Sequence, residues 1–60
     1  MEILIKIDAE SMMYHTYIDC ELYDARDGFK NIEDIVSDAV TTFLYDPDVD
    51  YSSGFKVEFA

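Results

Sequence analysis

Nucleophilic chemistry in this chain would depend on its single histidine, His15, and its single cysteine, Cys20. Such catalysis needs an activated nucleophile beside a base that accepts its proton. The two residues lie in one segment that alternates like a β-strand, and their odd separation sends the two side chains to opposite faces. We therefore expect Cys20 to be a small buried apolar residue and the chain not to be an enzyme.

Acidic side chains are the other candidates for chemistry. Asp46, Asp48 and Asp50 are spaced like the opening of a Ca²⁺-binding loop, but the sixth position is Tyr51 where glycine is required. The twelfth position is Val57 where a bidentate glutamate is required. We expect a solvated acidic loop, with weak Ca²⁺ binding as the alternative, and we predict no metal site and no cofactor.

The charge balance indicates the kind of partner. The 60 residues include 14 Asp and Glu against 4 Lys and Arg, a net charge of −10. Direct binding to nucleic acid or to an anionic membrane needs lysine and arginine, so neither is expected. A positively charged protein is the expected partner, and solubility or adaptation to a salty cytoplasm are the alternative explanations of the charge.

Some of these acids are explained by folding alone. Glu33 and Asp34 fall in the first turn of an expected helix, where negative charge complements the helix dipole. Asp46, Asp48 and Asp50 follow the negative end of that helix, with no lysine or arginine nearby in the sequence. Folding is expected to gain nothing from these three carboxylates.

A band of carboxylates along the helix side is therefore the first predicted interface. Asp38 lies one turn from Asp34, a like-charge pair that folding does not favour. Neighbours in the band would be ~6 Å apart, and duplex phosphates advance ~3.4 Å per nucleotide along one strand. We expect such a band to fit a basic nucleic-acid groove, although carboxylates on any acidic surface have broadly similar spacing. The predicted band consists of Asp24, Asp27, Asp34, Asp38, Asp46, Asp48 and Asp50.

Two N-terminal segments alternate between apolar and polar residues, as strands do. In residues 2–8 the isoleucines at 3, 5 and 7 share one face. Residues 13–23 are expected to form one longer strand. Its inward face carries Tyr14, Thr16, Ile18, Cys20 and Leu22. Its outward face carries His15 and two tyrosines, Tyr17 and Tyr23, which form a second candidate interface because tyrosine is enriched at interface hot spots.

The period then changes from two to that of an amphipathic helix over residues 32–44. Asn31 is the expected N-cap, and Pro47 ends the helix because the residue before proline is disfavoured in helical geometry. The last strand is expected over 55–59, with Phe55, Val57 and Phe59 facing inward.

These elements predict one α+β domain over residues 1–60, with the order ββαβ. The simplest sheet has three strands in the order 2-1-3, so that the first strand is central and antiparallel to both neighbours. One helix covers one face, and the other face is open.

Several expectations concern the cellular setting. A single cysteine allows no internal disulfide and suits a reducing cytosol. The N-terminal residues do not resemble a secretory signal, and the apolar runs are much shorter than the ~20 residues of a membrane helix. A cytoplasmic protein is expected. It would be a monomer or a weak homodimer, since two copies that each have a net charge of −10 repel each other.

In size, charge and compactness the chain resembles the small acidic inhibitors that phages encode against host defence, the anti-CRISPR and anti-restriction nucleic-acid mimics. That resemblance implies an inhibitor that occludes the basic nucleic-acid-binding surface of a host nuclease, polymerase or CRISPR effector. The alternative is a regulatory or antitoxin-like module that docks through Tyr17, Tyr23 and Leu4 on the open sheet face, or through a sheet edge.

Overall fold

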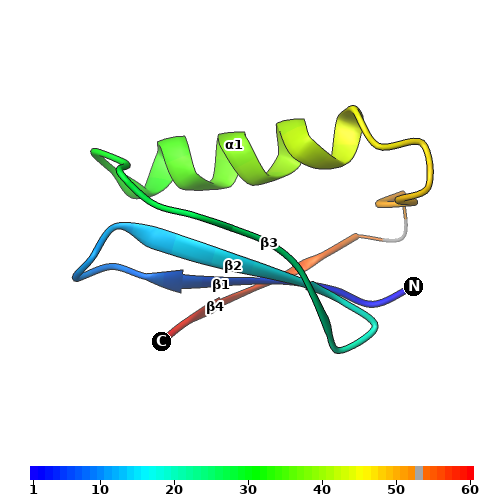
Figure 1. Cartoon of the computed structure of the whole chain (residues 1–60), viewed down its shortest axis with the longest axis horizontal. Helices are drawn as coiled ribbons and strands as arrows, with labels where there is room; N and C mark the ends of the chain where they lie inside the picture. Colours follow the sequence, from blue (N-terminus) through cyan, green and yellow to red (C-terminus); the bar gives the residue numbers. More distant parts are fainter. Residues whose placement is uncertain (53) are drawn as a thin grey trace.

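One helix lies across one face of a four-stranded sheet (Figure 1). The computed structural model describes residues 1–52 and 54–60. Within these residues no helix is long and apolar enough to cross a membrane. The elements are β1 (Ile3–Asp8), β2 (Met13–Ile18), β3 (Glu21–Arg26), α1 (Ile32–Leu44) and β4 (Lys56–Phe59).

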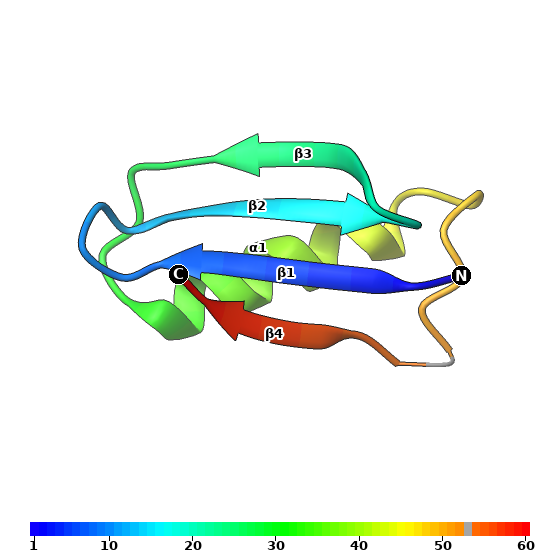
Figure 2. The ribbon, with the colours of Figure 1, turned by 90° about the horizontal axis from the view of Figure 1, so that it is seen from below.

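The strand order is β3-β2-β1-β4, with β1–β2 and β2–β3 antiparallel and β1–β4 parallel (Figure 2). The α+β class and the single helix on one face are confirmed. The prediction of three strands in the order 2-1-3 is wrong. So is the expected antiparallel placement of the last strand beside the first.

The error arises at Asp19 and Cys20. The strand expected over 13–23 is two strands joined by a two-residue turn, in which Asp19 and Cys20 have φ of 50° and 69°. Positive φ at both central residues is typical of the type I′ hairpin turn, whose twist matches that of the flanking strands. This extra reversal inverts the direction of the chain before α1, so β4 runs parallel to β1.

The hairpin also changes which residues face the helix. Ile18 packs against the core as expected. Cys20 is exposed in the turn, however, and Leu22, opposite Tyr17, is 60% exposed. The predicted burial of Cys20 and Leu22 is therefore wrong. The register shifts between Thr16 and Tyr17, leaving Tyr23 as the extra residue of a bulge.

The core lies between α1 and the two central strands. Ile3, Ile5 and Ile7 of β1 are buried, as their alternation predicts. From α1, a stripe of residues spaced four apart covers them: Ile35, Ala39 and Phe43. The helix bounds match the prediction, and Asn31 Oδ1 accepts a hydrogen bond of 2.9 Å from the Asp34 N–H, which confirms the N-cap.

The helix leaves β4 uncovered. It packs against β1 and β2, while Phe55, Val57 and Phe59 remain 38%, 41% and 61% exposed. The predicted burial of these three side chains is thus wrong. Val49 is buried instead and anchors the loop after α1 to the core.

Candidate functional site: an acidic groove between α1 and β3

The bulge in β3 places Tyr23 against the helix. Its ring packs on Phe43, with centroids 6.0 Å apart, and its hydroxyl donates a hydrogen bond of 2.6 Å to Asp46 Oδ2. Tyr23 therefore does not lie on the open sheet face, and that prediction is wrong. The same bulge brings a residue of β3 into contact with the loop that follows α1.

This hydrogen bond changes the acidity of both groups. Tyr23 and the Asp48 N–H hold the pKa of Asp46 below its usual value of 3.8. The Asp46 hydrogen bond, together with burial, raises the pKa of Tyr23 to about 12. Asp46 is consequently ionised, and Tyr23 is a neutral donor, throughout the physiological pH range.

A second tyrosine holds a second carboxylate. Tyr14 of β2 is fully buried, and its hydroxyl donates a hydrogen bond of 2.7 Å to Asp38 Oδ2 on α1. Burial and the nearby Asp38 both raise the Tyr14 pKa. A buried tyrosine hydroxyl needs a polar partner, so Asp38 also stabilises the packing of α1 on β2.

Arg26 of β3 joins two members of the predicted band. Its Nε lies 3.1 Å from Asp24 Oδ2, and its Nη1 lies 3.6 Å from Asp38 Oδ2. One guanidinium thus bridges a carboxylate of the sheet edge and one of the helix, leaving a net charge of −1 on the three side chains. Arg26 is half exposed, so water screens this ion pair.

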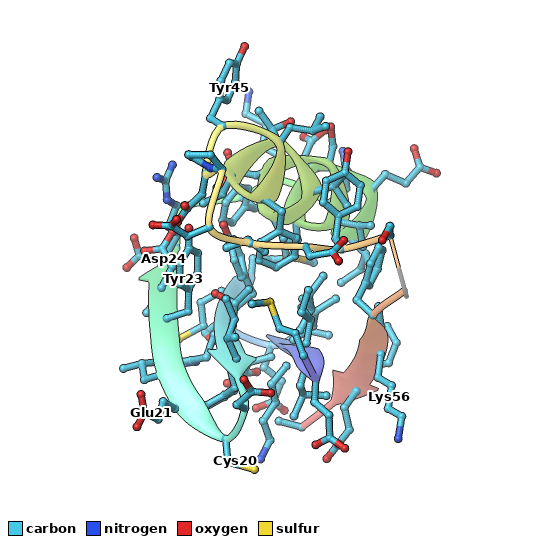
Figure 3. All side chains as sticks on the ribbon, turned by 90° about the vertical axis from the view of Figure 1, so that its right-hand side faces the viewer. Cys20, Glu21, Tyr23, Asp24, Tyr45 and Lys56 are labelled. Atoms are coloured by element: carbon cyan, nitrogen blue, oxygen red, sulfur yellow. The ribbon has the colours of Figure 1, made fainter. Side chains whose placement is uncertain are left out.

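Together these contacts create a shallow groove between α1 and β3, lined by residues that include Tyr23, Arg26, Asp38, Tyr45 and Asp46. Figure 3 shows Tyr23 and Asp24 together on the β3 side below the helix, and Tyr45 projecting away from the helix end. Tyr45 is 84% exposed. We call this region the acidic groove.

Sequence reasoning missed two residues that line the groove, Arg26 and Tyr45, and the buried Tyr14, which holds Asp38. Tyr14 gave a usable signal, because a tyrosine on the inward face of a strand must find a polar partner on the element that covers it. The sequence contains no comparable signal for Arg26 or Tyr45. Arg26 reaches the groove through the hairpin and the bulge, and Tyr45 is simply the residue that follows the helix.

Two aspartates of the loop after α1 accept hydrogen bonds that we did not expect from the sequence. Asp46 Oδ1 accepts the Asp48 N–H at 3.0 Å, in addition to the Tyr23 hydroxyl. Asp50 Oδ1 accepts both the N–H and the hydroxyl of Ser52, which lowers the Asp50 pKa. The expectation that folding gains nothing from these residues is wrong for Asp46 and Asp50.

The predicted band is therefore only partly assembled. Asp24 and Asp38 share Arg26, and Asp38 and Asp46 line the same groove, whereas no contact joins Asp50 to these three among the described residues. Three other members of the band are exposed on α1 or on the loops that flank it: Asp27, Asp34 and Asp48.

The open sheet face retains one of its two predicted tyrosines. Tyr17 lies opposite Leu4 on one side and Leu22 on the other, so an apolar row crosses β1, β2 and β3. The His15 ring stacks near Tyr17, with centroids 6.5 Å apart. Within residues 1–52 and 54–60, no three His, Cys, Asp or Glu side chains are grouped as metal ligands would be.

Comparison with protein-family models, with curated proteins and with solved structures gave no significant match. The fold and the groove define a small acidic α+β domain with a mixed sheet.

Proposed function

We propose that this chain is a non-enzymatic inhibitor that binds a positively charged, nucleic-acid-binding surface of another protein and occludes it. One observation carries the proposal. Asp38 of α1 and Asp46 of the loop after it line one groove, two tyrosine hydroxyls fix their positions, and Arg26 joins Asp24 of β3 to Asp38.

Preorganised carboxylates suit recognition of a cationic surface. Asp38 and Asp46 are each held by a tyrosine of the sheet, so binding a partner costs little additional side-chain ordering. The net charge of −10 attracts a basic partner over long range and accelerates encounter. Arg26 partly neutralises Asp24 and Asp38, so the strongest attraction is expected from Asp27, Asp34, Asp46 and Asp48.

Tyr45 supplies the apolar contact that charge alone cannot give. Exposed tyrosine is enriched at interface hot spots, because it offers a large contact area and a hydroxyl at little entropic cost. The expected partners are nucleases, polymerases or CRISPR effectors, whose basic grooves are shaped for nucleic acid.

Affinity capture with matched variants tests this proposal. The band variant carries Asp27→Asn, Asp34→Asn and Asp48→Asn, three changes to exposed aspartates of the predicted band, whose side chains accept no hydrogen bond within residues 1–52 and 54–60. Because each change removes one negative charge, the net charge goes from −10 to −7. The control variant carries Glu2→Gln, Glu10→Gln and Glu21→Gln, which also gives −7.

The wild type and the control should capture basic nucleic-acid-binding proteins from a bacterial lysate, and duplex DNA or added salt should release them. The band variant should lose most of this capture. Equal capture by the two variants would show that net charge alone attracts basic proteins, which would refute the acidic band as the binding surface.

The apolar row of Leu4, Tyr17 and Leu22 favours a second candidate function, a protein-binding module that docks through the open sheet face. Tyr17→Ala with Leu22→Ala separates the two proposals, because it removes exposed apolar surface and leaves the acidic groove unchanged. Loss of partner capture by this double variant alone would favour the open face.

A further inference from the structure

The β4 edge of the sheet carries exposed apolar side chains on its helix side. Val57 and Phe59 lie opposite Ile5 and Ile7 in the parallel register, so they belong to the helix side of the sheet. They are nevertheless 41% and 61% exposed, because α1 packs over β1 and β2. An exposed edge with apolar side chains is a template for pairing with another strand.

The other sheet edge is blocked. β3 carries a bulge at Tyr23 and bears Glu21, Asp24 and Arg26. Bulges and charged side chains are the devices by which proteins prevent pairing at exposed edges. β4 pairs with β1 without a bulge, and its two charged residues, Lys56 and Glu58, have opposite signs, so they can attract a second copy of the same strand.

The backbone of β4 presents free groups at Val57. The Ala60 N–H donates a hydrogen bond of 2.8 Å to Ile7 O, so Ala60 directs its backbone groups toward β1. Successive residues of a strand direct their N–H and C=O groups to alternate edges. Lys56 and Glu58 therefore also face β1, while the N–H and C=O of Val57 and Phe59 face the free edge.

The sequence around Val57 is self-complementary under a two-fold axis. If β4 pairs antiparallel with a second copy centred on Val57, the two Val57 residues exchange both backbone hydrogen bonds. Lys56 then lies opposite Glu58 of the second copy on the open face, and the axis repeats this pair. Phe59 lies opposite Phe55 of the second copy.

We propose that the chain forms a homodimer by antiparallel β4–β4 pairing centred on Val57, with Lys56 of each copy opposite Glu58 of the other. The sheet becomes continuous across the two copies, and both helices lie on the same side of it. The acidic groove is bordered by β3. β3 and β4 form opposite edges of the sheet (Figure 2), so the groove stays free in both copies. This inference does not depend on the proposed function.

The dimer should be weak, with a Kd on the order of 0.1 mM, because the contact is much smaller than the ~1,600 Å² of a stable complex. Added salt should tighten it by screening the repulsion between two copies of −10 each. Sedimentation equilibrium measures the mass against the monomer value of 7.0 kDa. The measurement is made at about 0.5 M salt, where long-range repulsion between the two copies is largely screened.

Charge variants test the pairing itself. Lys56→Glu changes the net charge from −10 to −12, and Glu58→Lys changes it to −8, but each puts like charges opposite one another. Both single variants should weaken the dimer, by on the order of tenfold. The double variant Lys56→Glu with Glu58→Lys restores both the opposite-charge pairs and the net charge of −10, and should restore the wild-type Kd.

Glu10→Lys is the matched control for Glu58→Lys, because it also gives −8 and lies in the turn after β1. It should dimerise at least as well as the wild type. A dimer that Glu10→Lys and Glu58→Lys affect equally would overturn the proposal, and so would a chain that stays monomeric at about 1 mM, ten times the expected Kd. Circular dichroism melting of each variant verifies its fold.

Cross-linking tests the register. In a Cys20→Ser background, Val57→Cys should form an intermolecular disulfide on oxidation, because a hydrogen-bonded antiparallel pair has Cα atoms ~5.5 Å apart. Phe55→Cys should not cross-link to itself, because the two copies of residue 55 would be four positions out of register, ~13 Å apart. Efficient cross-linking through residue 55 and not through residue 57 would overturn the proposed register.

Discussion

The Tyr23 hydroxyl donates a hydrogen bond of 2.6 Å to Asp46 Oδ2, and this contact links strand β3 to the loop that follows the helix. It depends on the bulge that turns Tyr23 toward Phe43. One polar contact therefore fixes a carboxylate of the acidic groove and helps to hold the helix end against the sheet edge.

Tyr23→Phe should lower the melting temperature, with an effect that depends on pH. The folded-state pKa of Asp46 is lowered from 3.8, so its contribution is present above about pH 4 and is lost as pH falls through the folded value. The folded-state pKa of Tyr23 is raised from 10.0 to about 12, so its contribution is present below pH 10 and is lost as pH rises through 12.

The difference in melting temperature between the wild type and Tyr23→Phe should thus be largest from about pH 4 to pH 10 and should shrink on either side. Thermal denaturation followed by circular dichroism across this range measures it. Tyr45→Phe, at an 84% exposed ring, is the control and should have no such pH profile. A difference that is constant with pH would contradict the Tyr23–Asp46 hydrogen bond.

Tyr14→Phe should destabilise the fold more than Tyr23→Phe does, because Tyr14 is fully buried. It removes a donor to the charged Asp38 and should cost about 1–2 kcal/mol of unfolding free energy. Urea denaturation of Tyr14→Phe, Asp38→Asn and the double variant measures this coupling. Additive effects of the two single changes would show that Tyr14 and Asp38 do not interact.

The hairpin turn at Cys20 makes a separate prediction. A non-glycine residue in the left-handed region costs roughly 1–2 kcal/mol, and Cys20 has φ of 69°. Cys20→Gly relieves that cost and should raise the unfolding free energy by up to about 1 kcal/mol after the added flexibility of the unfolded chain is counted. Cys20→Val should lower it, because a β-branched residue is disfavoured at positive φ. The opposite order of stabilities would contradict the two-residue turn.

The helix and the first strand could be predicted because their signals are local. Asn31 and Pro47 bracket an apolar stripe of helical period, and the isoleucines of β1 alternate without interruption. The hairpin could not be predicted in this way. Asp19-Cys20 lacks the glycine that usually marks such a turn, and the alternation of residues 13–23 continues through it.

The remaining errors follow from that turn and from the bulge. The hairpin moves Leu22 to the open face, and the bulge moves Tyr23 to the helix side. Neither the exposure of β4 nor the role of Arg26 follows from periodicity, because each depends on how far the helix reaches across the sheet. The aspartates of the band were identified from charge alone, and their hydrogen bonds to Tyr14 and Tyr23 are tertiary contacts.

The proposed occlusion of a nucleic-acid-binding surface is tested most directly by competition for the captured partner. Labelled duplex DNA or RNA bound to that partner is titrated with the chain, and fluorescence anisotropy follows the bound nucleic acid. We predict complete displacement, which weakens as salt increases and is about tenfold weaker for Asp27→Asn with Asp34→Asn and Asp48→Asn. A ternary complex in which the partner keeps its nucleic acid while binding this chain would contradict the central claim.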